Sequence, residues 1–273
     1  MKKPKSLSNE LCLRGNTWIA ADIHLGPNSP KTAACFYQFL LKAEQNCDQL
    51  LLCGDIFNAW IGDELAQQPP PWLADAMQSM RHFSHQRPLY LMRGNRDFLL
   101  GHNFAYAVGA QLLPDQIIIH QGELRFLLTH GDELCTDDQA YQRFRKLVRA
   151  PWVQKLFYQL PLASRQKLAN FFRQRSKKSG QYKPMSITDV SPLSCQQLLY
   201  ANQLRLLIHG HTHRPAIHSL DQTKNTYRVV IPDWECEHSE PSRFGWVSIL
   251  NNTVHLHEND RIQTLELSRM LEP

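Results

Sequence analysis

Five short polar segments, each placed directly after a run of apolar residues, constrain the fold of this 273-residue chain more than any other feature. Short apolar runs bounded by polar turns are typical of buried strands, so these segments are expected at strand ends. In α/β proteins the loops beyond the strand ends line the crevice in which catalytic groups gather. The sequence therefore predicts one site assembled from five loops: Asp22-Ile23-His24, Gly54-Asp55, Gly94-Asn95-Arg96-Asp97, His130-Gly131-Asp132 and Gly210-His211-Thr212-His213.

The side chains of these loops are suited to divalent metal ions. They offer carboxylate, imidazole and amide oxygen atoms without a thiolate, and this mixture favours Mn, Fe or Zn over the all-oxygen shells of Mg and Ca. Seven such groups for two ions require one of them to bridge, and a carboxylate can span ions about 3.5–4 Å apart. We expect Asp55 to be the bridge and Mn(II) to be the ion.

Length and composition fit one α/β domain. At 42% apolar residues the chain can bury a sizeable core, and helical spacing of apolar residues is found at 32–45 and 71–82. The first ten residues lack the apolar stretch of a signal peptide, and no apolar run approaches about 18 residues. We therefore expect a cytoplasmic protein. Its seven cysteines are scattered without a C-x-x-C pair, which predicts reduced thiols.

One block of the chain is strongly basic. Residues 139–188 contain twelve Lys or Arg and no Asp or Glu, although the whole chain carries only +5. The same block contains aromatic and aliphatic residues at partly helical spacing, and Pro151 and Pro161 are expected to begin helices. Because the block lies between the fourth and fifth segments, we expect a helical cap that overhangs the site. Such a cap could bind nucleic acid, an anionic membrane or an amphiphilic anionic substrate, or it could simply be a helical hairpin with solvated cations.

In this order, the five segments resemble the calcineurin-like metallophosphoesterase superfamily. The resemblance implies a four-layer αββα sandwich of the α/β (α+β) class. It places the domain at 15–258, the cap insertion at about 139–190, and tails at 1–14 and 259–273. It also implies a first ion bound by Asp22, His24, Asp55 and His213, and a second ion bound by Asp55, Asn95, His130 and His211.

Arg96 departs from the pattern of the superfamily. Most members carry a histidine at this position, and that histidine is taken to protonate the leaving group. An arginine cannot supply this proton, because its pKa stays above about 12. A phosphate monoester needs no acid to depart, because its second pKa is about 6. Arg96 therefore favours a diphosphate bond as the target, with the guanidinium holding the second phosphate.

Three longer stretches resemble one branch, the UDP-2,3-diacylglucosamine diphosphatases of lipid A biosynthesis. They are Gly94 to Gly101, His130 to Asp138 and Ile208 to Pro215, within a resemblance that runs from about Thr17 to Trp234. This branch uses Mn(II) at the cytoplasmic face of the inner membrane, as a peripheral protein. It hydrolyses its lipid-linked nucleotide sugar to UMP and 2,3-diacylglucosamine 1-phosphate (lipid X). The apolar side of the cap would then receive two acyl chains, and its cations would face the sugar phosphate or the anionic membrane surface.

The branch also implies roles for single residues. Asp55, Asn95, Arg96 and His211 are expected to be catalytic, with attack of a metal-bound hydroxide on the UMP phosphorus, while Asp97 or Asp132 holds neighbouring groups in place. The alternative is a metal-dependent phosphodiesterase or nuclease, but a nuclease should keep the histidine acid, so no nucleic-acid partner is expected. Gly180 departs from relatives that often carry Asn there. The expected substrate-binding positions are Asn95, Arg96, Asp138, Ser176, Gly180, Lys183 and His211.

Overall fold

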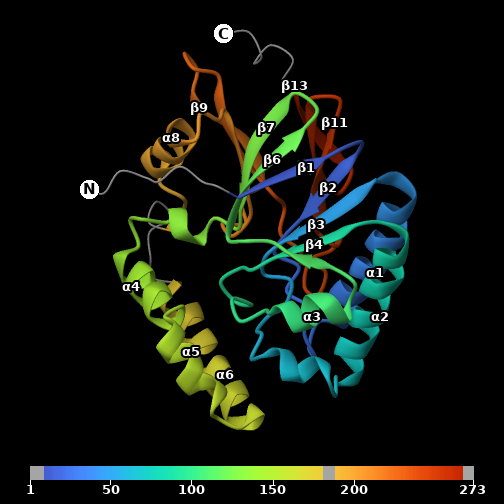
Figure 1. The fold of residues 1–273 in the computed structure, drawn as a ribbon, viewed down its shortest axis with the longest axis vertical. Coiled ribbons are helices and arrows are strands. Elements are labelled where there is room, and N and C mark those ends of the chain that lie inside the picture. The colour runs from blue at the N-terminus through green and yellow to red at the C-terminus, as the bar shows by residue number, and fades with distance from the viewer. Residues whose placement is uncertain (1–8, 181–187, 267–273) are drawn as a thin grey trace.

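Two β-sheets stacked face to face form the centre of the molecule (Figure 1). The structure is a computed structural model that describes residues 9–180 and 188–266. The first sheet has the order β1 (Glu10–Leu13), β6 (Gln116–Gln121), β7 (Leu124–Thr129), β8 (Leu206–His209), β10 (Thr226–Val230), β9 (Ala216–Asp221). The second has the order β13 (Arg261–Glu266), β12 (Thr253–Glu258), β11 (Gly245–Leu250), β2 (Thr17–Ala20), β3 (Gln49–Cys53), β4 (Leu89–Met92), β5 (Gln111–Leu112).

The strands that carry the five segments are parallel within each sheet. In the second sheet β2, β3 and β4 run in one direction, and in the first sheet β7, β8 and β10 do so as well. Parallel strands end at the same edge of their sheet, so residues that follow them are brought together. The register aligns Ala20 with Leu52 and Cys53 with Met92. The loops after these strands consequently begin side by side.

The sheets and helices form four layers. Between the sheets, the inward residues of both sheets make one apolar core, with Leu51, Phe126 and Ile208 at 0–1% exposure. Helices α1 (Pro30–Asn46), α2 (Pro71–Gln86) and α3 (His102–Ala107) pack on the outer face of the second sheet, and α8 (Pro192–Ala201) packs on that of the first. The predicted αββα sandwich is confirmed.

Helix α1 shows how the sequence produces the outer layer. Pro30 stands in its first turn, where a missing N–H costs nothing. Phe36, Phe39, Leu40 and Ala43 then follow at helical spacing and are all buried against the second sheet. At about 25 cal/mol per Å² of apolar surface, the side chains of Phe36, Phe39 and Leu40 each contribute roughly 1.5–3 kcal/mol. The helix is longer by a few residues than the predicted 32–45, because the pattern weakens at the ends.

Residues 139–180 of the basic block form the helices α4 (Gln139–Val148), α5 (Pro151–Tyr158) and α6 (Leu162–Gly180). They form an arm beside the sandwich, seen at the lower left of Figure 1. Several of their apolar side chains face solvent, with Trp152 exposed by 64% and Leu156 and Phe171 by 55% each. The ring of Phe144 lies 5.4 Å from that of Phe172 and joins α4 to α6. The helical nature of this insertion agrees with the prediction.

The sheets extend further along the chain than the expected domain of 15–258. Strand β1 pairs with β6, and β13 pairs with β12, so residues expected in the tails add strands at two sheet edges. Both strands are largely exposed, and their pairing depends on neighbours far away in the sequence. Across 9–180 and 188–266, none of the helices combines the length and the apolar character needed to cross a bilayer.

Candidate metal centre

The expected metal ligands meet at one end of the sandwich. Asp22 and His24 follow β2, Asp55 follows β3 and Asn95 follows β4 in the second sheet, while His130 follows β7 and His211 and His213 follow β8 in the first. The backbone here is unusual. Five of these residues have positive φ angles of 51–69° although none is glycine: Asp22, His24, Asp55, His211 and His213. Such conformations cost free energy and cluster at functional sites, where the surrounding structure holds them in place.

Two glycines allow the loops to approach closely. A Cβ atom on Gly54 would lie 2.6 Å from His130 Nδ1 and 2.7 Å from the Gly94 backbone. A Cβ atom on Gly94 would lie 2.2 Å from Asp55 Oδ1. Any side chain at either position would therefore separate the loops that carry the ligands.

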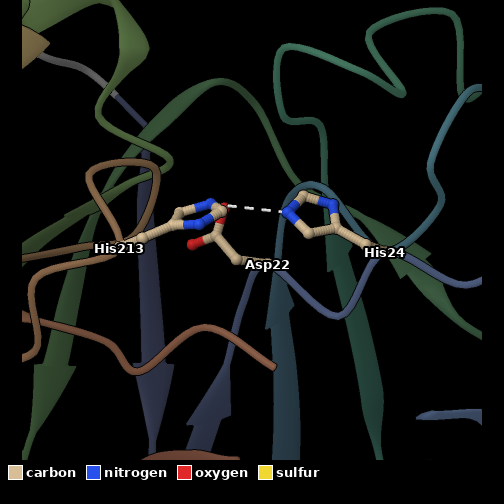
Figure 2. Close-up of side chains that lie close together, drawn as sticks. All are labelled: Asp22, His24 and His213. Atoms are coloured by element: carbon tan, nitrogen blue, oxygen red, sulfur yellow. Dashed lines mark hydrogen bonds and ion pairs between the residues drawn. The ribbon is translucent and has the colours of Figure 1, made fainter. Parts of the chain in front are cut away.

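One group of ligand atoms contains Asp22, His24 and His213. Figure 2 shows the two imidazole rings turned toward each other, with the Asp22 carboxylate beside His213. His213 Nε2 lies 3.4 Å from His24 Nε2 and 3.4 Å from Asp22 Oδ1. Asp22 Oδ1 and His24 Nδ1 are buried without a hydrogen-bond partner in the described part of the chain. Buried polar atoms are almost always satisfied, so these converging atoms fit a cation.

A second group of the expected ligands lies around Asn95. Its Oδ1 atom lies 3.0 Å from His130 Nε2 and 2.8 Å from His211 Nδ1. Asp55 lies between the two groups, because its Oδ1 is 3.6 Å from His130 Nε2 and its Oδ2 is 4.0 Å from His24 Nδ1. The ligand atoms of Asp22, Asp55 and His130 also lie within 4.8 Å of one another. This position of Asp55 suits a bridging carboxylate.

The buried carboxylate of Asp97, outside the set of expected ligands, holds two of the loops together. Asp97 accepts hydrogen bonds from the backbone N–H groups of Gly94, Asp55, Ile56 and Phe57, at 2.7–3.3 Å. It thereby connects the loops after β3 and β4. The expectation that Asp97 holds neighbouring groups in place agrees with these contacts.

Histidine ring orientation is set by further acceptors. His130 Nδ1 lies 3.0 Å from the Cys53 carbonyl oxygen, and His213 Nδ1 lies 3.3 Å from Asp233 Oδ2. Such contacts fix the ring and the tautomer of a metal-binding histidine. Asp233 was not singled out in the sequence, although it follows the apolar strand β10 as the other segments follow theirs. The strand-end signal could have found it.

The charges of the site are strongly coupled. Burial raises the pKa of Asp22, but the close contact with His213 and the charge of that ring outweigh it and hold that pKa well below its usual range. Burial lowers the pKa of His130, but the Asp55 and Asp22 carboxylates outweigh it and raise that pKa to about 9. In His213 the Asp22 and Asp233 carboxylates likewise overcome burial and raise the pKa to about 10. For His211, burial and the charge of His130 lower the pKa to about 3.

Two arginines from distant parts of the chain share an acceptor beside the ligands. Arg96 Nε lies 3.4 Å from Asp55 Oδ2, and Arg96 Nη1 donates to Asn58 Oδ1 at 3.3 Å. Arg173 of α6 donates to the same Asn58 oxygen at 2.9 Å. Burial and the charge of Arg96 lower the pKa of Arg173. Two neighbouring guanidiniums at the edge of a metal site can bind an anion with more than one phosphate.

The structure gives less information on the other residues that are expected to bind substrate. Asp138 caps α4 by accepting from the Tyr141 N–H at 3.0 Å. Ser176 and Gly180 lie in the last turns of α6, where the structure describes the backbone alone, and Lys183 lies outside the described residues. No local pattern singles out Asn58 or Arg173, because the two residues that make this contact are 115 positions apart in the chain.

The architecture and the ligand set define a metallophosphoesterase. Residues 15–215 match the family model described as calcineurin-like phosphoesterase. The chain belongs to this family, and its curated relatives place it in the branch of the UDP-2,3-diacylglucosamine hydrolases. Both expected resemblances are thereby confirmed.

Curated relatives cover most of the chain. The UDP-2,3-diacylglucosamine hydrolase of Bordetella parapertussis is 47% identical over 243 residues, which cover 88% of this chain and 94% of the relative. The enzymes of the same name from Serratia proteamaculans and Vibrio cholerae are 42% and 40% identical, and each alignment covers 82% of this chain and 93% of the relative.

Solved structures resemble the chain more remotely. Vacuolar protein sorting 29 from Cryptosporidium parvum is 12% identical with a TM-score of 0.47, over 92% of this chain and 95% of that one. The phosphoesterase YfcE from E. coli is 13% identical with a TM-score of 0.47, over 93% of this chain and all of the other.

Proposed function

We propose that the protein hydrolyses the diphosphate bond of UDP-2,3-diacylglucosamine, with release of UMP and 2,3-diacylglucosamine 1-phosphate (lipid X). The observation that carries this proposal is the position of Arg96, whose guanidinium lies beside the Asp55 carboxylate. The relatives named for this substrate support it, at 40–47% identity over at least four fifths of the chain. The diphosphate, rather than a simple phosphodiester, is the bond that this environment suits.

We further propose that two Mn(II) ions occupy the centre. The first would be held by Asp22, His24, Asp55 and His213, and the second by Asp55, Asn95, His130 and His211. The buried, unpartnered atoms Asp22 Oδ1 and His24 Nδ1 support this assignment. When bound, two such ions supply an activated water and neutralise charge on phosphoryl oxygens.

The side chains have distinct tasks in this proposal. Arg96 holds the phosphate of the leaving group with parallel N–H donors, and no acid is required because a phosphate monoester departs as an anion. Asn95 and His211, whose Oδ1 and Nδ1 atoms are 2.8 Å apart, orient the phosphoryl group that remains on UMP. Asp55 keeps the two halves of the site at a fixed separation, because it faces His24 with one oxygen and His130 with the other.

The cap provides for the lipid half of the substrate. Its exposed apolar side chains, such as Trp152, Leu156 and Phe171, suit acyl chains, and its cations suit the sugar phosphate. We propose substrate contacts at Asp138, Ser176, Gly180 and Lys183, in addition to Asn95, Arg96 and His211. The same surface suits peripheral attachment to the cytoplasmic face of the anionic inner membrane, which sedimentation with anionic and neutral vesicles would test.

The test is Mn(II)-dependent release of UMP from UDP-2,3-diacylglucosamine in detergent micelles. Asp55→Ala is expected to abolish release, and Asp75→Ala, an exposed carboxylate on α2, serves as the matched control. UDP-N-acetylglucosamine, which lacks the acyl chains, should be a poor substrate. Binding of metal without release of UMP would refute the proposal and favour a phosphodiesterase with another substrate.

Arg96 has its own test. Arg96→Met should reduce the rate by 100-fold or more with little change in thermal stability, because the side chain is one-third exposed. Arg96→Lys should recover only part of the rate, because an ammonium group lacks the planar pair of donors. Near-normal turnover by Arg96→Met would contradict the role given to this residue.

A further inference from the structure

One face of helix α4 is directed at the loops that carry two of the second ion's proposed ligands. Tyr141, Gln142, Arg145 and Arg149 are half-buried on this face, whereas Arg143 and other residues between them are exposed. The spacing is that of one helical stripe. The stripe is polar, and most of its contacts are hydrogen bonds and ion pairs, while the Tyr141 ring stacks on that of His211 with 6.0 Å between the ring centroids.

Arg149 binds the loop of Asn95. Its Nη2 atom donates to the carbonyl oxygen of Gly94 at 3.0 Å, directly before Asn95 in the chain. Its Nη1 atom pairs with Asp115 Oδ2 at 2.5 Å, and its guanidinium lies over the Phe98 ring at 5.9 Å. The side chain is only 16% exposed, and these three contacts hold it in place. Because this carbonyl group belongs to the peptide bond before Asn95, holding it orients the backbone of Asn95 and thereby its side chain.

Arg145 binds the loop of His130. Its Nε atom donates to Asp132 Oδ2 at 2.6 Å, and the Tyr141 hydroxyl donates to the same oxygen at 2.6 Å. Gln142 Nε2 donates to the Asp132 carbonyl oxygen at 2.9 Å. Asp132 is fully buried and stands two residues after His130. Three residues of one helix therefore hold the segment that presents this ligand.

The ligands of the first ion are held differently. His213 is oriented by Asp233, the backbone after Asp55 is held by Asp97, and the His24 carbonyl accepts from Asn58 Nδ2 at 2.6 Å. All of these groups belong to the sandwich and its own loops. The sandwich also contacts the loops of the second ion, through Asp97 on Gly94 and Cys53 on His130, so the difference between the two halves is that α4 supports the second.

We infer that helix α4 positions the ligands of the second ion, through Arg149 on the Asn95 loop and Arg145 on the His130 loop. Those of the first ion are positioned by the loops of the sandwich, with Arg173 of α6 bound to Asn58. This inference rests on the two-ion site proposed above. It gives the first helix of the cap a task in building the centre in addition to any contact with the lipid. Arg145 and Arg149 are thus positioning residues, which act through the loops that they hold.

The experiment is a titration of metal-free protein with Mn(II), followed by calorimetry and by electron paramagnetic resonance. The wild type should bind two ions and give the signal of a coupled Mn(II) pair. Arg149→Met and Arg145→Met should bind the first ion with wild-type affinity and the second about 10–100-fold more weakly. Their electron paramagnetic resonance spectrum should then be that of isolated Mn(II). Arg149→Lys should be intermediate, because it keeps the charge beside Asp115 but reaches fewer acceptors.

A matched control and the opposite outcomes make the test decisive. Arg143→Met removes an exposed cation from the other side of α4 and should bind both ions as the wild type does. A melting temperature equal to that of Arg143→Met shows that a variant is folded, so weakening of both sites in such a variant cannot be attributed to misfolding. The inference would be overturned if Arg149→Met and Arg145→Met bound both ions as tightly as the wild type does. It would also be overturned if the affinities for both ions fell equally. Fewer than two ions on the wild type would overturn the two-ion site and the inference with it.

Discussion

Asp97 offers the sharpest test of how the centre is held together. Its buried carboxylate accepts four backbone N–H groups, two on each oxygen: Gly94 and Asp55 on Oδ1, Ile56 and Phe57 on Oδ2. Asp97→Asn keeps the shape of the side chain but replaces one oxygen by an NH2 group. Whichever way the amide turns, two backbone N–H groups then face a donor in place of an acceptor.

The magnitude follows from the number of lost bonds. A buried N–H group left without an acceptor costs about 1–3 kcal/mol, so two of them cost roughly 2–6 kcal/mol of the free energy of unfolding. For a chain of this size each kcal/mol corresponds to about 2–4 °C, and we expect the melting temperature to fall by roughly 4–24 °C.

The assay is thermal unfolding of metal-free protein followed by circular dichroism, because bound ions would add their own stabilisation. Asp75→Asn, the same change at an exposed position on α2, should leave the melting temperature within about 2 °C. A melting temperature of Asp97→Asn equal to that of this control would show that the four hydrogen bonds do not hold the loops together.

Three further predictions concern the same centre. Gly54→Ala should destabilise the protein by about 2–5 kcal/mol in urea unfolding, because φ is +84° and the added Cβ would meet the Gly94 backbone; a loss below 1 kcal/mol would contradict this. Asp233→Asn should weaken binding of the first ion by about 10–100-fold in calorimetry and leave that of the second unchanged, since the proposed ligand that Asp233 contacts is His213; equal loss at both sites would contradict that role. In the metal-free protein His130 and His213 have pKa values of about 9 and 10, so both carry protons at pH 7 that an ion must displace. Affinity should therefore rise as the pH is raised from 7 to 9, with proton release measurable in buffers of different ionisation enthalpy, and an affinity that falls over this range would refute the assignment.

Much of the centre could be predicted from the sequence because its signals are local. Each apolar run predicts a buried strand, and each ligand stands within a few residues of a strand end, so the position of Asp22, Asp55 or His130 requires no knowledge of distant residues. The chemistry of the side chains then indicates a metal centre. The arginine at position 96, where most members of the superfamily have histidine, is likewise visible within the four residues Gly94 to Asp97.

The sequence by itself therefore determined the strands, the ligand types and the basic character of the cap, since periodicity and composition act over a few residues at a time. The tertiary structure decided which side chains support the ligands. Arg173 reaches Asn58, Asp233 reaches His213, and Arg149 reaches the carbonyl before Asn95. It also decided that β1 and β13 extend the sheets at their edges. These contacts join residues from different elements, and a polar side chain selects its partner only when packing brings the two elements together, which no local pattern contains.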